Sequence, residues 1–189
     1  RIGWVGTLRC LPSFELLLGL AERLGDGVRI DMHGIVHDHV LPDFHERIKA
    51  RPNVTFHGPY AYPDGLSDIY KSCDFVWSQD LWQRGANSDW LLPNRIYEAS
   101  WCGCPSIAVA KTGTGKYVEK HQLGLAVEQP SIDDLAQCIQ RTWPDQAVSC
   151  ANGLLSRDPF EFQQSTQDVL SALAPVMRGE PQSDQVVPS

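Results

Sequence analysis

The amino-acid sequence predicts an α/β protein in which a doubly wound parallel sheet of about six strands has helices on both faces. Short apolar segments with strand character alternate strictly with amphipathic segments of helical periodicity along most of the 189 residues. No internal repeat interrupts this alternation. Strands that alternate with helices in this way form parallel sheets covered on both faces, so the pattern itself indicates the fold class.

The first strand–helix unit opens the chain. Residues 2–6 form an apolar strand that ends in the glycine turn Gly6-Thr7-Leu8-Arg9. Leucines and Phe14 then recur at helical spacing as far as Leu24, and Ser13 can act as the N-cap of this helix. A pair of glycines closes the helix.

Two similar units follow. Residues 28–33 and 54–57 are predicted strands, and the second ends at Gly58. A helix over residues 42–50 lies between these strands, and another helix over residues 64–72 follows them. The alternation is therefore kept through the first third of the chain.

A fourth predicted strand, residues 74–78, and a polar loop, residues 79–89, lead to the helix around which the sequence is organised. Pro93 suits the first turn of this helix, where a missing N–H costs nothing. Gly103 and Pro105 end it and turn the chain into the next strand.

The last units have the same order. Residues 107–110 and 125–127 are the fifth and sixth predicted strands, and a short helix over residues 113–121 lies between them. A final helix over residues 132–142 has Ser131 as its N-cap and two aspartates in its first turn.

The organisation predicted from these elements has three parts. Residues 1–142 form the sheet domain, residues 143–178 add helices with patches at 147–155 and 160–173, and residues 179–189 form a polar tail. The tail carries too little apolar surface to order itself, so we expect it to be flexible.

Composition excludes several classes of protein. Apolar residues make up 42% and charged residues 21% of the chain, which is usual for a soluble globular protein, and the formal charge of −7 argues against a nucleic-acid partner. No apolar run approaches the length of a membrane-spanning helix. Because the chain starts at Arg1 and enters a strand at once, we expect a piece of a longer protein. Six scattered cysteines without zinc-site spacing indicate reduced thiols in a cytosolic protein.

The central helix carries the first indication of a binding site. Arg95 and Glu98 are three residues apart, which places them near one another on one helix face close to its start. A charged pair at a helix start in a parallel α/β protein suggests a site for an anionic ligand that carries hydroxyl groups.

Two other patterns have weaker interpretations. His33, His37 and His39, with Asp38, fall in a loop and match no metal motif, so we expect an ordinary polar loop and no metal site. The sequence around Gly113 is not a phosphate-binding P-loop, because its first glycine is replaced by alanine and its Ser or Thr by tyrosine.

The tryptophans divide by position. Trp4, Trp77 and Trp101 lie in predicted core elements and are expected to pack there. Trp82 and Trp90 lie in the polar loop, where they could line a sugar site.

Three segments taken together resemble the C-terminal, donor-binding half of GT-B glycosyltransferases of the glycosyltransferase 4 type, from about residue 2 to residue 142. The first is Val5-Gly6-Thr7-Leu8-Arg9, a strand with a glycine turn and a basic residue. The second is Val54-Thr55-Phe56-His57-Gly58 with the Tyr70 helix and the strand Asp74-Phe75-Val76-Trp77-Ser78. The third is Pro93-Asn94-Arg95-Ile96-Tyr97-Glu98 with Gly103 and Pro105. The resemblance implies a Rossmann-like sheet that forms the C-terminal half of a GT-B fold.

The resemblance also implies roles for individual residues. Glu98 would accept hydrogen bonds from the ribose hydroxyls of a nucleotide-sugar. Arg9, with Arg95, would neutralise the charge that grows on the leaving diphosphate. The backbone at Gly6 and Thr7 would approach that diphosphate.

Other positions have smaller implied roles. The turn at His57, Gly58 and Pro59 corresponds to the one that contacts the base. Asn94, next to Arg95, is expected to bind the nucleotide-sugar as well, and Asp89 and Asn87 are the nearest polar candidates for contacting the sugar.

The sequence departs from the family pattern at three places. Trp90 stands where the first acid of the Glu-x7-Glu signature is expected, and Phe14 stands where a second basic residue is expected. The Gly-x-Gly turn between the two acids is replaced by residues 91–94. Arg95 can supply the lost positive charge.

The three charged residues of the predicted site also have purely structural interpretations. Glu98 can be a first-turn charge that favours the helix dipole, Arg95 its solvated partner, and Arg9 a surface residue after a strand.

The function expected from the resemblance is that of a glycosyltransferase donor domain of hexosyltransferase type. Its substrate would be a UDP- or GDP-sugar, with no tightly bound cofactor. The sugar would pass to a hydroxyl of a polysaccharide or lipid-linked glycan, held by an N-terminal domain outside this chain, so the chain alone would be inactive. We expect a cytoplasmic location, with peripheral membrane association of the full-length protein.

Two alternatives remain open. A non-catalytic nucleotide-sugar-binding or scaffold module of the same fold is favoured by the missing acid. Another Rossmann-like cofactor domain is disfavoured, because no Gly-x-Gly-x-x-Gly follows the first strand.

Overall fold

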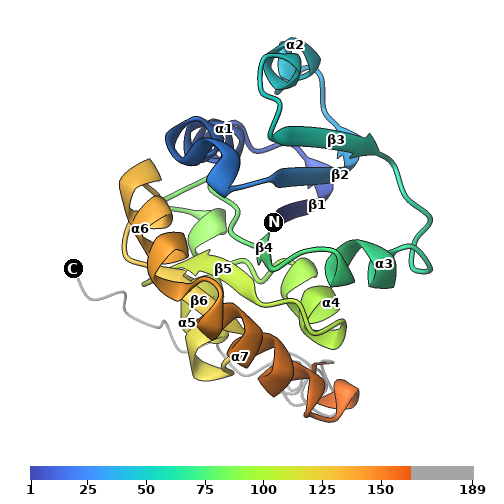
Figure 1. Cartoon of the computed structure of the whole chain (residues 1–189), viewed down its shortest axis with the longest axis vertical. Coiled ribbons are helices and arrows are strands. Elements are labelled where there is room, and N and C mark those ends of the chain that lie inside the picture. The colour runs from blue at the N-terminus through green and yellow to red at the C-terminus, as the bar shows by residue number, and fades with distance from the viewer. Residues whose placement is uncertain (163–189) are drawn as a thin grey trace, which may run out of the picture.

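The computed structural model describes residues 1–162 and shows one parallel sheet with helices on both faces (Figure 1). Its six strands are β1 (Ile2–Leu8), β2 (Ile30–Val36), β3 (Val54–Gly58), β4 (Phe75–Trp77), β5 (Ser106–Val109) and β6 (Gly124–Val127). They lie in the order β3-β2-β1-β4-β5-β6, and each neighbouring pair is parallel. The predicted fold class is confirmed.

Helices connect the strands. The α-helices are α1 (Leu11–Leu24), α2 (Phe44–Lys49), α3 (Leu66–Lys71), α4 (Arg95–Trp101), α5 (Gly113–Lys120), α6 (Ile132–Thr142) and α7 (Asp145–Leu155). Three short 3-10 helices are η1 (Gly25–Gly27), η2 (Asn87–Asp89) and η3 (Pro159–Phe162).

The two faces of the sheet are assigned by the alternation of side chains along each strand. In β1, Ile2, Trp4 and Leu8 pack in the core beneath α1, α2 and α6, whereas Val5 packs beneath α3 and α4. In β5, Ala108 points to the second face, where it packs with residues of α4, α5 and α7. Both faces of the sheet are therefore buried beneath helices, which explains why the strand sequences are nearly continuous apolar runs.

β1 and β4 separate toward their carboxyl ends. β1 pairs with β2 over seven consecutive residues, from Ile2 to Leu8, but pairs with β4 only at Ile2 and Gly3. These two strands are neighbours in space without being consecutive in the chain, so the sheet reverses its winding between them. Ligands of doubly wound sheets bind at such a crevice, at the carboxyl ends of the strands.

Element boundaries differ from the prediction at several helix starts. α1 begins at Leu11 after Cys10, and Ser13, the predicted N-cap, lies buried inside the first turn, where its hydroxyl donates to the carbonyl of Gln79. α4 begins at Arg95 with Asn94 as N-cap, so Pro93 precedes the helix and does not lie in its first turn. Proline near a helix start is compatible with either position, and packing decides between them.

Two strand boundaries were also predicted wrongly. β1 continues through Thr7 and Leu8, because these residues pair with Ile35 and Val36. β2 consequently covers residues 30–36 in place of the predicted 28–33. A partner strand extends a segment whose own residues look like a turn, since each pair adds backbone hydrogen bonds.

The remaining helices bear on the predicted C-terminal region. The predicted patch at residues 147–155 is α7, whereas most of the patch at 160–173 and the whole tail at 179–189 lie outside the described residues.

Trp101 was predicted to pack in the core, but it is 41% exposed and lies edge-to-face against Phe160. Among the described residues, none of the helices is both long and apolar enough to cross a lipid bilayer.

The N-cap of α6 provides a stability prediction. Ser131 accepts a hydrogen bond from the backbone N–H of Asp134 at 3.1 Å, as its position before two aspartates predicted. We expect Ser131→Ala to lower the free energy of unfolding by about 1 kcal/mol in urea titrations, because that N–H loses its acceptor. Gln140→Ala, on the exposed side of α6, is the control and should leave stability nearly unchanged. Equal effects of the two substitutions would contradict the capping role.

Candidate functional site

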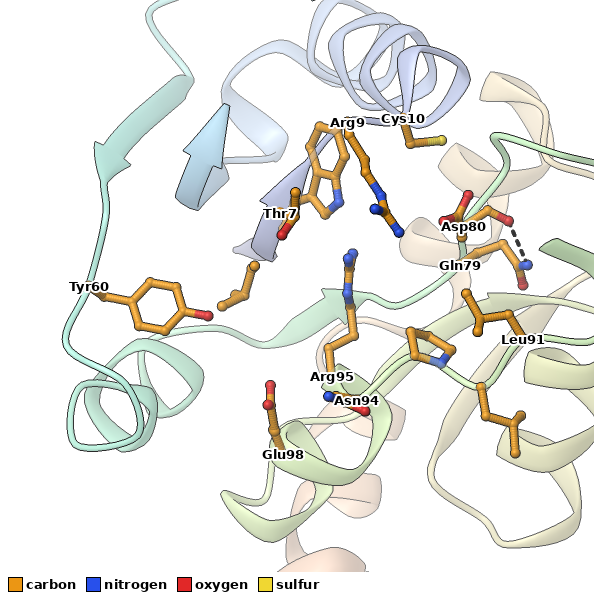
Figure 2. A pocket seen from close by; sticks show the side chains of 15 residues that line it. Thr7, Arg9, Cys10, Tyr60, Gln79, Asp80, Leu91, Asn94, Arg95 and Glu98 are labelled. Carbon is orange, nitrogen blue, oxygen red and sulfur yellow. Dashed lines mark hydrogen bonds between the residues drawn. The ribbon is translucent and has the colours of Figure 1, made fainter. Parts of the chain in front are cut away.

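A polar cleft of about 340 Å³ opens where β1 and β4 separate (Figure 2). It lies at the carboxyl ends of these strands and at the start of α4. Its lining residues are Trp4, Val5, Gly6, Thr7, Arg9, Cys10, Tyr60, Gln79, Asp80, Leu91, Leu92, Pro93, Asn94, Arg95 and Glu98. Six of the predicted site residues are therefore brought together here: Gly6, Thr7, Arg9, Asn94, Arg95 and Glu98.

Two guanidinium groups face each other in the cleft. Arg9 reaches it from the turn after β1 and Arg95 from the start of α4, and Figure 2 shows their side chains pointing toward one another. Neither guanidinium lies within ion-pairing distance of a carboxylate among residues 1–162. Two like charges that face each other across an open space form a site for an anion with more than one charge.

Arg95 is held in place by the end of β4. One of its guanidinium nitrogens donates to the carbonyl of Trp77, the last residue of β4, at 3.2 Å. This carbonyl is free to accept because β1 has already separated from β4 at that level. Burial lowers the pKa of Arg95, while Tyr70, Asp80, Cys10 and Glu98 act in the opposite direction. The guanidinium remains charged, since its ordinary pKa lies far above neutral pH.

Glu98 lies beside two tyrosines at one end of the cleft. Its carboxylate accepts a hydrogen bond from the Tyr70 hydroxyl at 3.1 Å, and the Tyr60 ring points toward the same region in Figure 2. Burial, followed by the nearby Glu98 charge, raises the pKa of Tyr70, so its hydroxyl stays protonated and donates. The second carboxylate oxygen of Glu98 receives no hydrogen bond from the described residues and can accept one from a ligand.

Arg95 and Glu98 were predicted to lie near one another as a charged pair. Within residues 1–162 no contact of 4.0 Å or less joins their charged atoms, because Arg95 turns to the Trp77 carbonyl and Glu98 to Tyr70. The two groups therefore occupy different parts of the same cleft, which leaves each of them available to a ligand.

The glycine turn after β1 depends on backbone conformation. Gly6 has a φ of +110°, which L side chains rarely adopt. Gly34 lies opposite it in β2, and a Cβ atom there would lie 1.7 Å from the Gly6 carbonyl oxygen. These two glycines together allow the chain to turn into the cleft.

Gln79 and Asp80 belong to the cleft but were not singled out from the sequence. Gln79 is 1% exposed, and its side-chain oxygen accepts from the backbone N–H of Val109 and from the Thr112 hydroxyl. Its side-chain nitrogen donates to the backbone carbonyls of Asp80 and Ser88. Gln79 thus joins the end of β4 to β5 and to the following loop. The sequence signal that could have found Gln79 and Asp80 is their position, as two polar residues, directly after a buried strand.

Other predicted candidates lie outside the cleft. Asp89 accepts from the backbone N–H of Gly85 and so folds its own loop, and Gly58 lies at the end of β3 without lining the cavity. Asn87 and Trp82 line a neighbouring cavity, whereas Trp90 is 70% exposed and lines neither.

The histidine loop and the cysteines form no cluster suited to a metal. His33 stacks on His57, His37 lies near His39, and no group of three potential metal ligands occurs among residues 1–162. All six cysteines, each of which lies in this range, are free thiols. Burial raises the pKa of Cys104 and of Cys73, so these two thiols are not poised as nucleophiles.

The chain is similar to a curated protein, to several solved structures and to a family model. One curated relative is the succinoglycan biosynthesis protein ExoL of Rhizobium meliloti (strain 1021), which is 29% identical over 188 residues. This match covers 100% of the present chain and 47% of the relative, so the chain spans about half the length of ExoL.

Solved structures share the fold. Anabaena Alr3699/HepE in complex with UDP and glucose is 20% identical with a TM-score of 0.62, over 90% of this chain and 48% of that one. The C-terminal domain of the glycosyl transferase group 1 family protein LpcC from Francisella tularensis is 15% identical with a TM-score of 0.60. That match covers 96% of this chain and 86% of the LpcC domain.

The family assignment comes from a sequence model. Residues 1–145 match the model described as "Glycosyl transferases group 1", a range that contains all six strands and the helices α1 to α6. The match supports the glycosyltransferase part of the resemblance inferred from the three motifs; the family 4 type stays a prediction. The chain therefore belongs to the glycosyl transferases group 1 family.

Proposed function

We propose that this chain is the donor domain of a glycosyltransferase and that its cleft binds a nucleoside-diphosphate sugar. The observation that carries the proposal is the pair of guanidinium groups, Arg9 and Arg95, which face one another at the point where the sheet reverses its winding. A carboxylate acceptor, Glu98, lies at one end of the same cleft. Together these groups match a ligand with a charged centre and a hydroxyl-bearing end.

The diphosphate would lie between the two arginines. Transfer breaks the bond between the anomeric carbon and a phosphate oxygen, and negative charge grows on the leaving nucleoside diphosphate. Two guanidinium groups beside the diphosphate would stabilise that charge, and each can donate two parallel N–H bonds to phosphate oxygens. The positive φ of Gly6 lets the backbone approach the same group without a side chain in the way.

The ribose would lie at Glu98. An ionised carboxylate with one oxygen bonded to Tyr70 retains an oxygen for a ribose hydroxyl. The base would then lie beyond it, beside the Tyr60 ring and the turn at Gly58. UDP is the first nucleotide to test, since the HepE structure of the same fold contains UDP.

The acceptor would be a hydroxyl of a polysaccharide or lipid-linked glycan. Its oxygen would form the new bond to the anomeric carbon as the nucleoside diphosphate leaves, and its proton would be released. The relative named for succinoglycan biosynthesis supports this class of acceptor. An N-terminal domain that holds the acceptor, and the cytoplasmic location expected from the sequence, are parts of the same proposal.

A binding module without catalysis is the second candidate, and one observation favours it. The Thr114 hydroxyl donates to the Leu91 carbonyl, and a Cβ atom on Gly113 would lie 2.8 Å from the Trp90 carbonyl oxygen. The segment that carries Trp90 is therefore packed on the start of α5, and Trp90 itself is 70% exposed and does not line the cleft. A tryptophan at this position supplies no carboxylate for the sugar. Release of UDP from UDP-glucose in the presence of an acceptor would distinguish an enzyme from a binding module.

Calorimetric titration of the chain with UDP, GDP and ADP tests the donor site. We expect Glu98→Gln to weaken binding of the preferred nucleotide by roughly 10-fold, because a charged acceptor for the ribose becomes a weaker neutral one. Glu119→Gln, on the exposed side of α5, is the matched control and should bind like the wild type. If none of the three nucleotides binds the wild-type chain at millimolar concentration, the proposed function is wrong.

A further inference from the structure

The groups in the cleft follow one another in a definite order. Figure 2 shows Tyr60 and Glu98 at one end, the two arginines in the middle, and Asp80 with Gln79 at the other end. If the diphosphate lies between the arginines and the ribose at Glu98, as the proposed function has it, the transferred sugar must lie on the side of Asp80. This inference therefore rests on the proposed function and extends it.

A second cavity of about 330 Å³ lies beyond this end of the cleft. Its lining residues are Arg9, His37, His39, Val40, Asp80, Trp82, Gln83, Asn87 and Ser88. Arg9 and Asp80 line both cavities, so the two spaces meet at these side chains. A group attached to a phosphate held by Arg9 can therefore extend into the second cavity.

Asp80 is held in a fixed orientation by one of its two carboxylate oxygens. Its Oδ1 accepts from the backbone N–H of Trp82 at 2.7 Å and from the Ser88 hydroxyl at 3.1 Å. Its backbone carbonyl accepts from the buried Gln79 side chain at 2.9 Å. The other oxygen, Oδ2, accepts no hydrogen bond from the described residues. A carboxylate oriented in this way presents one oxygen to a donor in the cavity.

We propose that Asp80 binds a hydroxyl of the transferred sugar and that the second cavity holds this sugar. A carboxylate beside a phosphate site selects for a neutral ring with hydroxyl donors, because a further anionic group would be repelled. Histidine, asparagine and glutamine side chains supply polar groups, and the half-exposed Trp82 ring supplies an apolar face, as is typical of a small-molecule pocket. Asp80 thus provides the acid that Trp90 does not.

Comparing free nucleotide with nucleotide-sugar isolates the sugar contact. Wild type and Asp80→Asn are titrated with UDP, UDP-glucose, UDP-galactose and UDP-N-acetylglucosamine, and with GDP and GDP-mannose. We expect Asp80→Asn to weaken binding of the preferred nucleotide-sugar roughly 10-fold, because the free acceptor oxygen becomes an N–H donor. Affinity for the free nucleoside diphosphate should not fall, since the substitution removes a negative charge that repels the phosphates and removes no contact with them.

Asp89→Asn is the matched control, because Asp89 lies in the same loop but folds it through Gly85. It should not weaken binding of the nucleotide-sugar selectively. Asp80→Glu keeps the charge but displaces the carboxylate, and it should show the same selective loss. Thermal unfolding of each variant checks that the domain is folded, and Asp80→Glu serves if Asp80→Asn does not fold.

The possible outcomes separate this inference from the proposed function. Nucleotide binding with no selective loss of nucleotide-sugar in the Asp80 variants would overturn the role of Asp80 and leave the donor site standing. An equal selective loss in Asp89→Asn would also overturn it, because the loop and not the Asp80 contact would then be responsible. Absence of all nucleotide binding in the wild type would overturn both proposals.

Discussion

Replacement of Arg95 by alanine is expected to weaken binding of the preferred nucleoside diphosphate by roughly 30- to 100-fold. Arg95 comes from the start of α4, faces Arg9 across the cleft, and has a single hydrogen-bond acceptor, the Trp77 carbonyl, among the described residues. Its remaining N–H groups are available to phosphate oxygens. Loss of charge-assisted hydrogen bonds of this kind costs about 2–3 kcal/mol.

The measurement is calorimetric titration of Arg95→Ala and Arg95→Lys with UDP. Lysine keeps the charge but not the planar fork, so Arg95→Lys should recover only part of the affinity. Arg29→Ala, an exposed arginine that precedes β2 and lies outside the cleft, is the matched control. Unchanged UDP affinity in a folded Arg95→Ala variant would contradict the placement of the diphosphate between the two arginines.

Stability must be measured alongside affinity, because Arg95 also caps the end of β4. Its removal leaves the Trp77 carbonyl without its donor, and we expect this to lower the unfolding temperature modestly. The binding loss is attributed to the ligand only where circular dichroism shows the variant to be folded at the titration temperature.

Replacement of Gly34 by alanine is expected to destabilise the domain by about 3–5 kcal/mol. The added Cβ atom would lie 1.7 Å from the Gly6 carbonyl oxygen, and the φ of +131° at Gly34 is unfavourable for alanine. The clash cannot be relieved without moving β1 or β2, since Gly6 and Gly34 are paired residues of neighbouring strands inside the sheet. The strain should also disturb the turn that positions Arg9.

Urea titration of Gly34→Ala and Gly85→Ala separates the two causes. Gly85 also has a positive φ, +79°, but a Cβ atom there would meet no other atom within 4 Å. Its replacement should therefore cost only the backbone strain, about 1–2 kcal/mol. Equal destabilisation by both substitutions would contradict the steric role of Gly34.

Much of the fold was predictable because it depends on local patterns. Apolar segments at strand length and helical repeats at helix length alternate along the chain, and each of those predicted within residues 1–155 has its counterpart in the structure. The ends of strands were predicted less well where pairing with a neighbouring strand determines them. Thr7 and Leu8 look like a turn in isolation, but pairing with β2 makes them part of β1.

The candidate site was predictable in part, for a similar reason. Gly6, Arg9 and Glu98 belong to short motifs that can be recognised from the sequence alone, and all three line the cleft. Asp80 and Tyr60 carry no motif, and their place in the cleft depends on how β3 and β4 end. Asp89 was selected for its nearness in sequence, but its carboxylate turns to Gly85.

By itself, the sequence determined the order of strands and helices along the chain and the fold class. It also singled out Arg9 and Arg95 as candidate site residues. Only the tertiary structure decided that β1 and β4 separate after two residue pairs, and that Arg95 of α4 donates to the Trp77 carbonyl at the end of β4. It also decided that Asp80 stands between two cavities. The reason is physical: periodicity is a property of neighbouring residues, whereas a cleft depends on the packing of segments that lie far apart in the chain.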